Sequence, residues 1–260
     1  MAKNNKIRLD DLLVELGFFE SKNQAQTCII SRGVSINGQV FDKPGHKLLA
    51  DTSNIEVKDK ILEYVSRGAY KLKAAHQAWR LDFTDKVILD IGASTGGFTD
   101  YALKQGARLS LAIDVGHGQL HYKLQKDSRV INLEKTNFRD FDFESIAFEE
   151  KISFVVIDVS FISLVTILER LKFLIQKSAD NFSTDLIIIA LLKPQFEAGK
   201  EIMDKCKGVI SDEKIRKEVF ERTVESIKAI DYKLLGEPIE SPIKGAKGNI
   251  EYLLNLYFSC

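Results

Sequence analysis

The sequence is poor in cysteine, in recognisable targeting signals and in long apolar runs. Its three cysteines, Cys28, Cys206 and Cys260, show no C-x-x-C spacing, so neither a disulfide framework nor a zinc ribbon is indicated. The longest uninterrupted apolar run, residues 186–192, is far shorter than the ~18 residues that a membrane span needs. No signal peptide is recognisable at the N-terminus. We therefore expect a protein of the reducing cytoplasm, with no membrane partner.

Charge is abundant but balanced. The 37 lysine and arginine residues equal the 37 aspartate and glutamate residues, and residues 1–60 carry nine basic against eight acidic side chains. A nucleic-acid site must therefore come from local clustering, because the net charge gives no support for one. No metal site is predicted either, because no ligand spacing with cysteine or carboxylate is formed by His46, His76, His117 or His121.

The N-terminal region begins with two predicted helices. The first ends near Gly17. A second helix is predicted over residues 22–31, with Ser21 as its N-cap and Gly33 after its end. The first helix is indicated by apolar residues at helical spacing, which are Ile7, Leu9, Leu12, Leu13 and Leu16.

Short strands follow these helices. Residues 34–40 alternate apolar and polar side chains around an Asn-Gly pair, which predicts a β-hairpin, and residues 55–57 supply a closing strand. We therefore expect a small α+β domain over residues 1–60, a linker over residues 61–66 and a larger domain over residues 67–260.

The larger domain has an α/β pattern. A helix that carries Lys71 and Trp79 precedes a series of apolar strands, and helical segments separate several of them. Such alternation predicts a mostly parallel sheet with helices on both faces. The strands are predicted over residues 87–91, 109–113, 128–133, 154–157, 186–191, 232–239 and 250–258, and the last two form a closing hairpin.

The first of these strands runs into a glycine-rich turn. Glycines let backbone N–H groups approach a ligand, and Asp114 at the end of the next strand is spaced to hold both ribose hydroxyls. Ala93 and Ser94 stand where the dinucleotide pattern has glycine, which favours S-adenosylmethionine because it has no pyrophosphate to bind. A tight turn without a ligand is the alternative. The predicted cofactor contacts are Gly92, Ala93, Ser94, Thr95, Gly96, Gly97, Phe98, Asp114 and, for the adenine edge, Asn137.

Polar residues also stand at the ends of other predicted strands. Asp158 ends the fourth strand, Lys193 ends the fifth and Glu251 opens the last. In an open α/β sheet, ligands bind outside the carboxyl ends of the strands. Each residue alone is most often a solvated terminus or a structural ion pair. The ordered set, with Lys71 ahead of the sheet, is far more specific.

Long motifs resemble the TlyA family, also called haemolysin A, whose large domain is similar to FtsJ-type ribose 2′-O-methyltransferases. The resemblance covers nearly the whole chain and implies a Rossmann-like, mostly parallel seven-stranded sheet and S-adenosylmethionine as cofactor. It also implies that Lys71, Asp158, Lys193 and Glu251 form a catalytic tetrad. The motifs are Ser66-Arg-Gly-Ala-x-Lys-Leu72, Asp90-Ile-Gly-Ala-Ser-Thr-Gly-Gly-Phe-Thr-Asp100, Asp114-Val-Gly-x-Gly-Gln-Leu120, Lys193-Pro-Gln-Phe-Glu197 and Lys247-Gly-Asn-x-Glu251.

The N-terminal region resembles the small RNA-binding domain named after a ribosomal small-subunit protein. The matching phrases are Arg8-Leu-Asp-x-x-Leu-Val, Ser21-Lys-x-Gln-Ala-Gln and Gly33-Val-x-Ile-Asn-Gly. The resemblance implies ribosomal RNA or ribosomal subunits as partners, and both domains agree on RNA because a ribose 2′-hydroxyl exists only there. The candidate RNA contacts are Arg8, Lys22, Arg32, Lys43 and Arg67.

The sequence lacks the residues that other methyl-transfer reactions require. Methylation of an adenine amino group calls for a D/N-P-P-Y/F turn where this chain has Asp158-Val-Ser-Phe161, and no cysteine lies where pyrimidine C5 methylation needs one. A membrane-active haemolysin and a non-catalytic RNA-binding protein remain as alternatives. The role of Lys193 is open, because a free lysine has a pKa near 10.4. If uncharged it acts as a base, and if charged it orients the hydroxyl.

Overall fold

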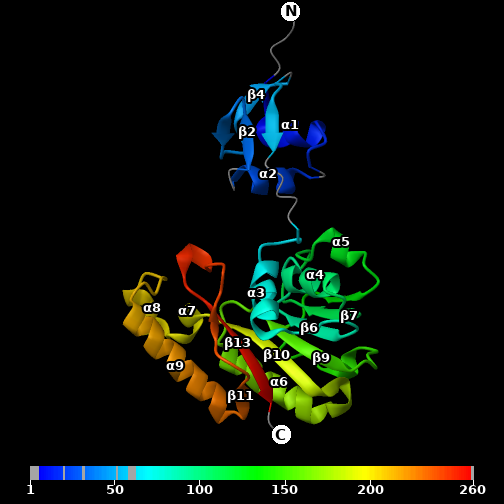
Figure 1. Ribbon diagram of the computed structural model, residues 1–260, viewed down its shortest axis with the longest axis vertical. Coiled ribbons are helices and arrows are strands. Elements are labelled where there is room, and N and C mark those ends of the chain that lie inside the picture. The colour runs from blue at the N-terminus through cyan, green and yellow to red at the C-terminus, as the bar shows by residue number, and fades with distance from the viewer. Residues whose placement is uncertain (1–5, 20, 31–32, 51, 58–62, 259–260) are drawn as a thin grey trace, which may run out of the picture. The chain divides into compact units, whose positions relative to one another are not determined.

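The computed structural model describes residues 6–19, 21–30, 33–50, 52–57 and 63–258. The chain divides into two compact units, Met1–Glu63 and Tyr64–Cys260 (Figure 1). Residues 61 and 62 of the expected linker lie outside the described residues. Tyr64 is buried in the core of the larger unit, and the Val65 N–H donates to Asp100 of that unit at 2.8 Å. The larger unit therefore begins at Tyr64.

The smaller unit packs two helices against short strands. Its core consists of Leu9, Leu13, Ala25, Ile29, Val34 and Ile36. Strand β2 lies between β3 and β5 in an antiparallel sheet, and β1 pairs with β4. The elements are β1 (Lys6–Arg8), α1 (Leu9–Glu15), α2 (Lys22–Ile30), β2 (Val34–Ile36), β3 (Gln39–Phe41), β4 (Lys47–Leu49) and β5 (Ile55–Val57).

Local geometry confirms the two predicted helices and the hairpin. Gly17, with a φ of 77°, ends α1, and its N–H donates to Val14 while that of Phe18 donates to Leu13, as in a Schellman motif. Asn37 and Gly38 have φ values of 50° and 79°, which a type I′ hairpin turn requires. The prediction for Ile7 is wrong. It lies in β1, because its backbone pairs with β4 before the helix begins.

The larger unit is built on one twisted sheet with the order β11-β13-β10-β9-β6-β7-β8 (Figure 1). Strands β10, β9, β6, β7 and β8 run parallel, and β13 is antiparallel to β10. This arrangement confirms the predicted fold class. The strands are β6 (Val87–Ile91), β7 (Leu109–Ile113), β8 (Val130–Leu133), β9 (Ile152–Ile157), β10 (Phe182–Leu192), β11 (Tyr232–Leu234), β12 (Ile239–Glu240) and β13 (Tyr252–Phe258).

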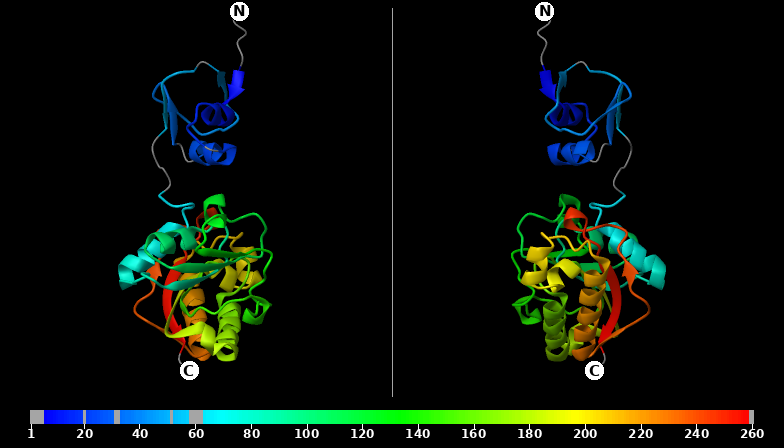
Figure 2. Two further views of the ribbon diagram at one scale, coloured as in Figure 1. Left: turned by 90° about the vertical axis from the view of Figure 1, so that its right-hand side faces the viewer. Right: turned by 90° about the vertical axis from the view of Figure 1, so that its left-hand side faces the viewer.

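Helices cover both faces of this sheet (Figure 2). Apolar side chains of α3, α4 and α5 pack with Ile88 of β6 on one face, whereas those of α6 and α9 pack with Leu89 on the other, as the period of two along a strand requires. The helices are α3 (Ala69–Trp79), α4 (Gly97–Lys104), α5 (Tyr122–Gln125), α6 (Leu164–Lys177), α7 (Pro194–Glu197), α8 (Lys200–Lys205) and α9 (Glu213–Ala229), with short 3-10 turns at Phe143–Ser145, Ala179–Asn181 and Ala246–Gly248.

The sheet has one strand more than the seven that were expected. The run predicted as one strand over residues 232–239 forms β11 and β12, and both pair with β13. Gly236 has a φ of 90° and Pro238 has no N–H to donate, so the ladder cannot continue between them. The closing hairpin is therefore interrupted rather than absent.

Candidate active site

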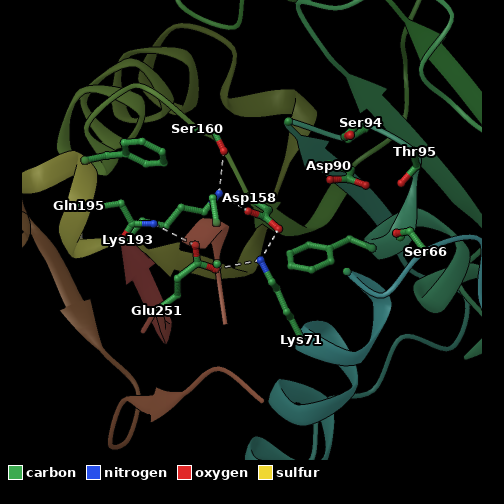
Figure 3. Close-up of a pocket in the computed structure, with 18 residues that line it drawn as sticks. Ser66, Lys71, Asp90, Ser94, Thr95, Asp158, Ser160, Lys193, Gln195 and Glu251 are labelled. Carbon is green, nitrogen blue, oxygen red and sulfur yellow. Dashed lines mark hydrogen bonds and ion pairs between the residues drawn. The ribbon is translucent and has the colours of Figure 1, made fainter. Parts of the chain in front are cut away.

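A cavity of about 280 Å³ opens at the carboxyl ends of β6, β9 and β10, on the larger unit (Figure 3). In a parallel sheet this edge brings together residues that are far apart in the sequence. The lining residues are Ser66, Gly68, Lys71, Asp90, Gly92, Ala93, Ser94, Thr95, Gly97, Phe98, Asp158, Ser160, Lys193, Gln195, Phe196, Gly245, Ala246 and Glu251.

The loop between β6 and α4 forms one wall of the cavity. Gly92 has a φ of 83°, and a Cβ atom there would lie 2.8 Å from the carbonyl oxygen of Asp158, so the turn requires glycine. Asp114 supports the loop because its Oδ2 accepts from the Ser94 N–H at 2.8 Å and its Oδ1 from the Gly116 N–H at 2.7 Å. The carboxylate therefore fixes the loop on which a ligand would rest.

Most of the predicted cofactor contacts lie in this cavity. Gly92, Ala93, Ser94, Thr95, Gly97 and Phe98 line it, whereas Gly96, Asp114 and Asn137 are not among its lining residues. Gly96 is the N-cap residue of α4 and has a φ of 88°. The Asn137 side chain accepts from the Arg139 N–H at 3.1 Å, which is a local turn contact.

The four residues of the expected tetrad meet in the cavity. The Lys71 ammonium lies 3.0 Å from Asp158 and 3.0 Å from Glu251, and the Lys193 ammonium lies 2.6 Å from Asp158 (Figure 3). Lys71 comes from α3, Asp158 follows β9, Lys193 follows β10 and Glu251 precedes β13. Asp158 therefore bridges the two lysines, and Lys71 bridges the two carboxylates.

These contacts shift the ionisation of the cluster. Burial opposes the charge of Asp158, but the ammonium groups of Lys193 and Lys71 outweigh burial and hold the pKa of Asp158 below its ordinary value. Burial likewise opposes the charge of Lys71, but Asp158 and Glu251 outweigh it, so the pKa of Lys71 is raised. Both groups are therefore charged at neutral pH.

Three contacts to the tetrad were not predicted from the sequence. Ser160 Oγ accepts from the Lys193 ammonium at 3.0 Å, and the Gln195 amide donates to Glu251 Oε1 at 3.1 Å. Gly245 packs on Glu251, whose Oε1 would lie 2.1 Å from a Cβ atom at position 245. Ser160 and Gln195 each stand two residues after a tetrad member that follows a strand. This position in the sequence could have identified them. Gly245 has no such signal.

The candidate RNA contacts differ in their surroundings. Arg8 donates two hydrogen bonds to the buried carboxylate of Asp10, at 2.9 and 2.8 Å, and the Lys22 ammonium lies 2.6 Å from Asp11. Lys43 is exposed. Arg32 lies outside the described residues. Arg8 and Lys22 are therefore held by acidic neighbours of their own unit.

Arg67 belongs to the larger unit and is exposed. It lines a second cleft, together with Lys71, Lys244 and Lys247 and without an acidic residue. This cleft shares Ser66, Gly68, Lys71, Gly245 and Ala246 with the cavity. The mouth of the tetrad cavity is therefore basic on the side of Arg67.

Comparison with known protein families agrees with this geometry. A family model described as an FtsJ-like methyltransferase matches residues 64–258, and one described as an S4 domain matches residues 7–52. The chain belongs to the FtsJ-like methyltransferase family. Its larger unit corresponds to the methyltransferase match, and its smaller unit contains the S4 match.

Relatives of this FtsJ-like methyltransferase include proteins of the TlyA family. "Hemolysin A" of Brachyspira hyodysenteriae is 42% identical, over 95% of this chain and 98% of the relative. "16S/23S rRNA (cytidine-2'-O)-methyltransferase TlyA" of Mycobacterium tuberculosis (strain ATCC 25618 / H37Rv) is 37% identical, over 96% of this chain and 89% of the relative. A solved structure from Streptococcus thermophilus, described as a hemolysin candidate, has a TM-score of 0.72 at 39% identity and covers 98% of this chain and 90% of that chain. The predicted resemblance to the TlyA family is confirmed.

Across the part of this FtsJ-like methyltransferase that the structure describes, no helix combines the length and the apolar character that crossing a membrane requires.

Proposed function

We propose that this methyltransferase transfers a methyl group from S-adenosylmethionine to ribose 2′-hydroxyls of ribosomal RNA, in the cytoplasm. The observation that carries the proposal is the contact of Lys71, Asp158, Lys193 and Glu251 beside the glycine loop. The name of the Mycobacterium tuberculosis relative, an rRNA (cytidine-2'-O)-methyltransferase, supports the same reaction. The S4 match supports RNA as the substrate.

The residues of the cavity fit S-adenosylmethionine. The loop between β6 and α4 lines the cavity with residues 92–95, 97 and 98, and Asp114 braces it from the end of β7. When bound, this cofactor supplies an electrophilic methyl group. We assign its methionine part to residues 92–98, its ribose to Asp114 and its adenine edge to Asn137.

Lys193 is the residue that we place at the reacting hydroxyl. Its ammonium has three N–H groups, of which one points to Asp158 and one to Ser160. The third can donate to the ribose oxygen, hold it in line with the methyl group and stabilise the negative charge that develops there. Positioning of this kind is worth roughly 7–11 kcal/mol when it is complete.

The other three tetrad members position Lys193. Asp158 fixes its ammonium at 2.6 Å, and Lys71 keeps Asp158 and Glu251 from repelling each other by lying 3.0 Å from both. Gln195 holds the other oxygen of Glu251. We therefore expect the four groups to act as a unit, so that the losses caused by single substitutions do not add.

The basic cleft extends the proposal to the RNA backbone. Arg67, Lys244 and Lys247 line it directly beside the tetrad cavity, which places positive charge where phosphates flanking the target ribose would pass. Lys43 and Arg8 would add RNA affinity from the smaller unit, which contains the S4 match. Arg32 and Lys22 complete the RNA contacts that we propose.

The reaction is tested with labelled S-adenosylmethionine and isolated ribosomal subunits, followed by nucleoside analysis. We expect the label in 2′-O-methylnucleosides, in a linkage that resists alkaline cleavage because the attacking hydroxyl is blocked. A label on a base contradicts the proposal. Substitution of both Lys244 and Lys247 by alanine should weaken RNA binding and reduce its salt dependence, while cofactor affinity stays unchanged.

A further inference from the structure

Asp90 is a buried carboxylate that the reaction described above does not use. It is the fourth residue of β6, it is only 1% exposed, and it lines the cavity. In Figure 3 it lies between Asp158 and the loop that carries Ser94 and Thr95. An ionised carboxylate in such a place is costly unless it is paired.

The hydrogen bonds to Asp90 reach only one of its oxygens. The Thr99 N–H and the Thr99 hydroxyl both donate to Oδ2, at 3.1 and 2.7 Å. Thr99 lies in the first turn of α4, so Oδ2 serves as an acceptor for unsatisfied groups at a helix start. Within the residues that the structure describes, no hydrogen bond to Oδ1 is formed.

The charges around Asp90 leave it without a cation. The neighbouring strands place two further carboxylates near it, Asp158 after β9 and Asp114 after β7. The lysines of the cavity, Lys71 from α3 and Lys193 after β10, pair with Asp158 and Glu251 instead. No ion pair to Asp90 occurs in the described parts of the chain. The two lysines balance the other two cavity carboxylates, and Asp90 is the excess negative charge.

Ionisation of Asp90 is correspondingly difficult in the free protein. Burial raises the pKa of Asp90 to about 7, the Asp158 and Asp114 carboxylates add to the rise, and the hydrogen bonds from Thr99 oppose it. Around neutral pH the side chain is therefore partly protonated, and a positive charge brought into the cavity would favour its ionised form.

We propose that Asp90 is the counter-charge of S-adenosylmethionine and makes the site distinguish this cofactor from its product, S-adenosylhomocysteine. The proposal rests on the cofactor assigned above. S-adenosylmethionine carries a sulfonium, an ammonium and a carboxylate, and hence one net positive charge. S-adenosylhomocysteine has a neutral thioether and no net charge. The cofactor binds with Asp90 ionised and its proton released to solvent, whereas the product binds with Asp90 protonated.

The expected size of the effect follows from proton linkage. A ligand that binds only the ionised form binds more weakly as pH falls through the pKa of the free protein. Between pH 7.0 and pH 5.5, a range below the titration of the amine of the ligand, affinity for S-adenosylmethionine should fall by about an order of magnitude. Affinity for S-adenosylhomocysteine should change less than twofold. At pH 6 the cofactor should release about one proton on binding, and the product almost none.

Titration calorimetry in buffers of different ionisation enthalpy measures the ligand affinity and the number of protons released, on the full-length protein. Asp90→Asn is the informative variant, because its amide oxygen still accepts from Thr99 while the charge is gone. It should bind S-adenosylhomocysteine as the wild type does, lose the proton release, and bind S-adenosylmethionine several-fold more weakly at pH 7.0.

Glu197→Gln is the matched control. Burial also raises the pKa of Glu197, and its carboxylate accepts from the Ser163 hydroxyl at 2.6 Å and the Leu164 N–H at 2.7 Å, but it does not line the cavity. This variant should keep the full pH dependence of the wild type.

Calorimetry on the wild type tests the proposed role of Asp90 even if Asp90→Asn fails to fold. Equal proton release with cofactor and product, or an affinity ratio that does not change with pH, overturns the role of Asp90 and leaves the proposed reaction intact. Binding of neither molecule overturns both. A pH dependence that persists in Asp90→Asn assigns the charge to another group and also contradicts the inference.

Discussion

Gly245 and Glu251 are packed so closely that position 245 has no room for a side chain. A Cβ atom on Gly245 would lie 2.1 Å from Glu251 Oε1, which is the oxygen that accepts from Gln195. Gly245 itself has a φ of −70°, so its backbone conformation is open to any residue. The requirement for glycine therefore comes from the carboxylate of the tetrad and not from the turn.

Substitution Gly245→Ala should consequently act on the site and leave the fold intact. The added methyl group pushes Glu251 away from Lys71, so we expect methyl transfer to fall about a hundredfold while the protein stays folded. In a Glu251→Ala background the same substitution should cost almost nothing further, because the clash is gone. Additive losses in the double variant would show that Gly245 acts elsewhere.

Asp114 should matter for cofactor affinity through the loop that it holds. Removing its carboxylate in Asp114→Ala frees the N–H groups of Ser94 and Gly116 and, in our proposal, the ribose hydroxyls. Two or more lost hydrogen bonds to a charged acceptor are worth roughly 3 kcal/mol, so calorimetry should show S-adenosylmethionine binding weakened by about a hundredfold. Equal affinity in the variant and the wild type would refute the assignment of Asp114.

Arg8 is expected to stabilise the smaller unit as well as to bind RNA. The bidentate contact with Arg8 lowers the pKa of Asp10 to about 2, and Asp10 is fully buried. Arg8→Ala should therefore lower the free energy of unfolding of this unit, since a buried carboxylate loses its main partner. Lys43→Ala, at an exposed position, is the control that should weaken RNA binding at unchanged stability.

The contact between Arg8 and Asp10 also determines how the stability of the smaller unit depends on pH. Because the pKa of Asp10 is lower in the folded than in the unfolded state, its stabilising contribution is complete above pH ~4 and is lost as pH falls towards about 2. Acid unfolding monitored for the smaller unit should show this loss in the wild type and much less of it in Arg8→Ala. An identical acid transition in both proteins would contradict the role given to Arg8.

Much of the fold and of the tetrad could be predicted from the sequence, because parallel strands end at one edge of the sheet. Asp158 and Lys193 stand directly after apolar strands, so their meeting follows from the topology. The family motifs added Lys71 and Glu251. Gly236 and Pro238 also indicate the interruption of the strand over residues 232–239, although this interruption was not predicted.

Other features depend on loop conformations that no spacing encodes. Gly245 approaches Glu251 only because the chain between β12 and β13 brings residues 245 and 246 to the wall of the cavity. The engagement of Arg8 with Asp10 also needs the structure, because the burial of Asp10 depends on how α1 and α2 pack. The significance of Asp90 could not be predicted from its motif, since it arises from the pairing of the lysines with other carboxylates.

The variant Lys193→Ala tests most directly whether Lys193 acts on the ribose hydroxyl. Methyl transfer to ribosomal subunits is measured beside calorimetric affinities for S-adenosylmethionine and for RNA, with the exposed Lys200→Ala as control. We expect transfer to fall at least a hundredfold while both affinities stay within about twofold, because the contribution of Lys193 is confined to the transition state. Retained formation of 2′-O-methylnucleosides by Lys193→Ala would contradict the account.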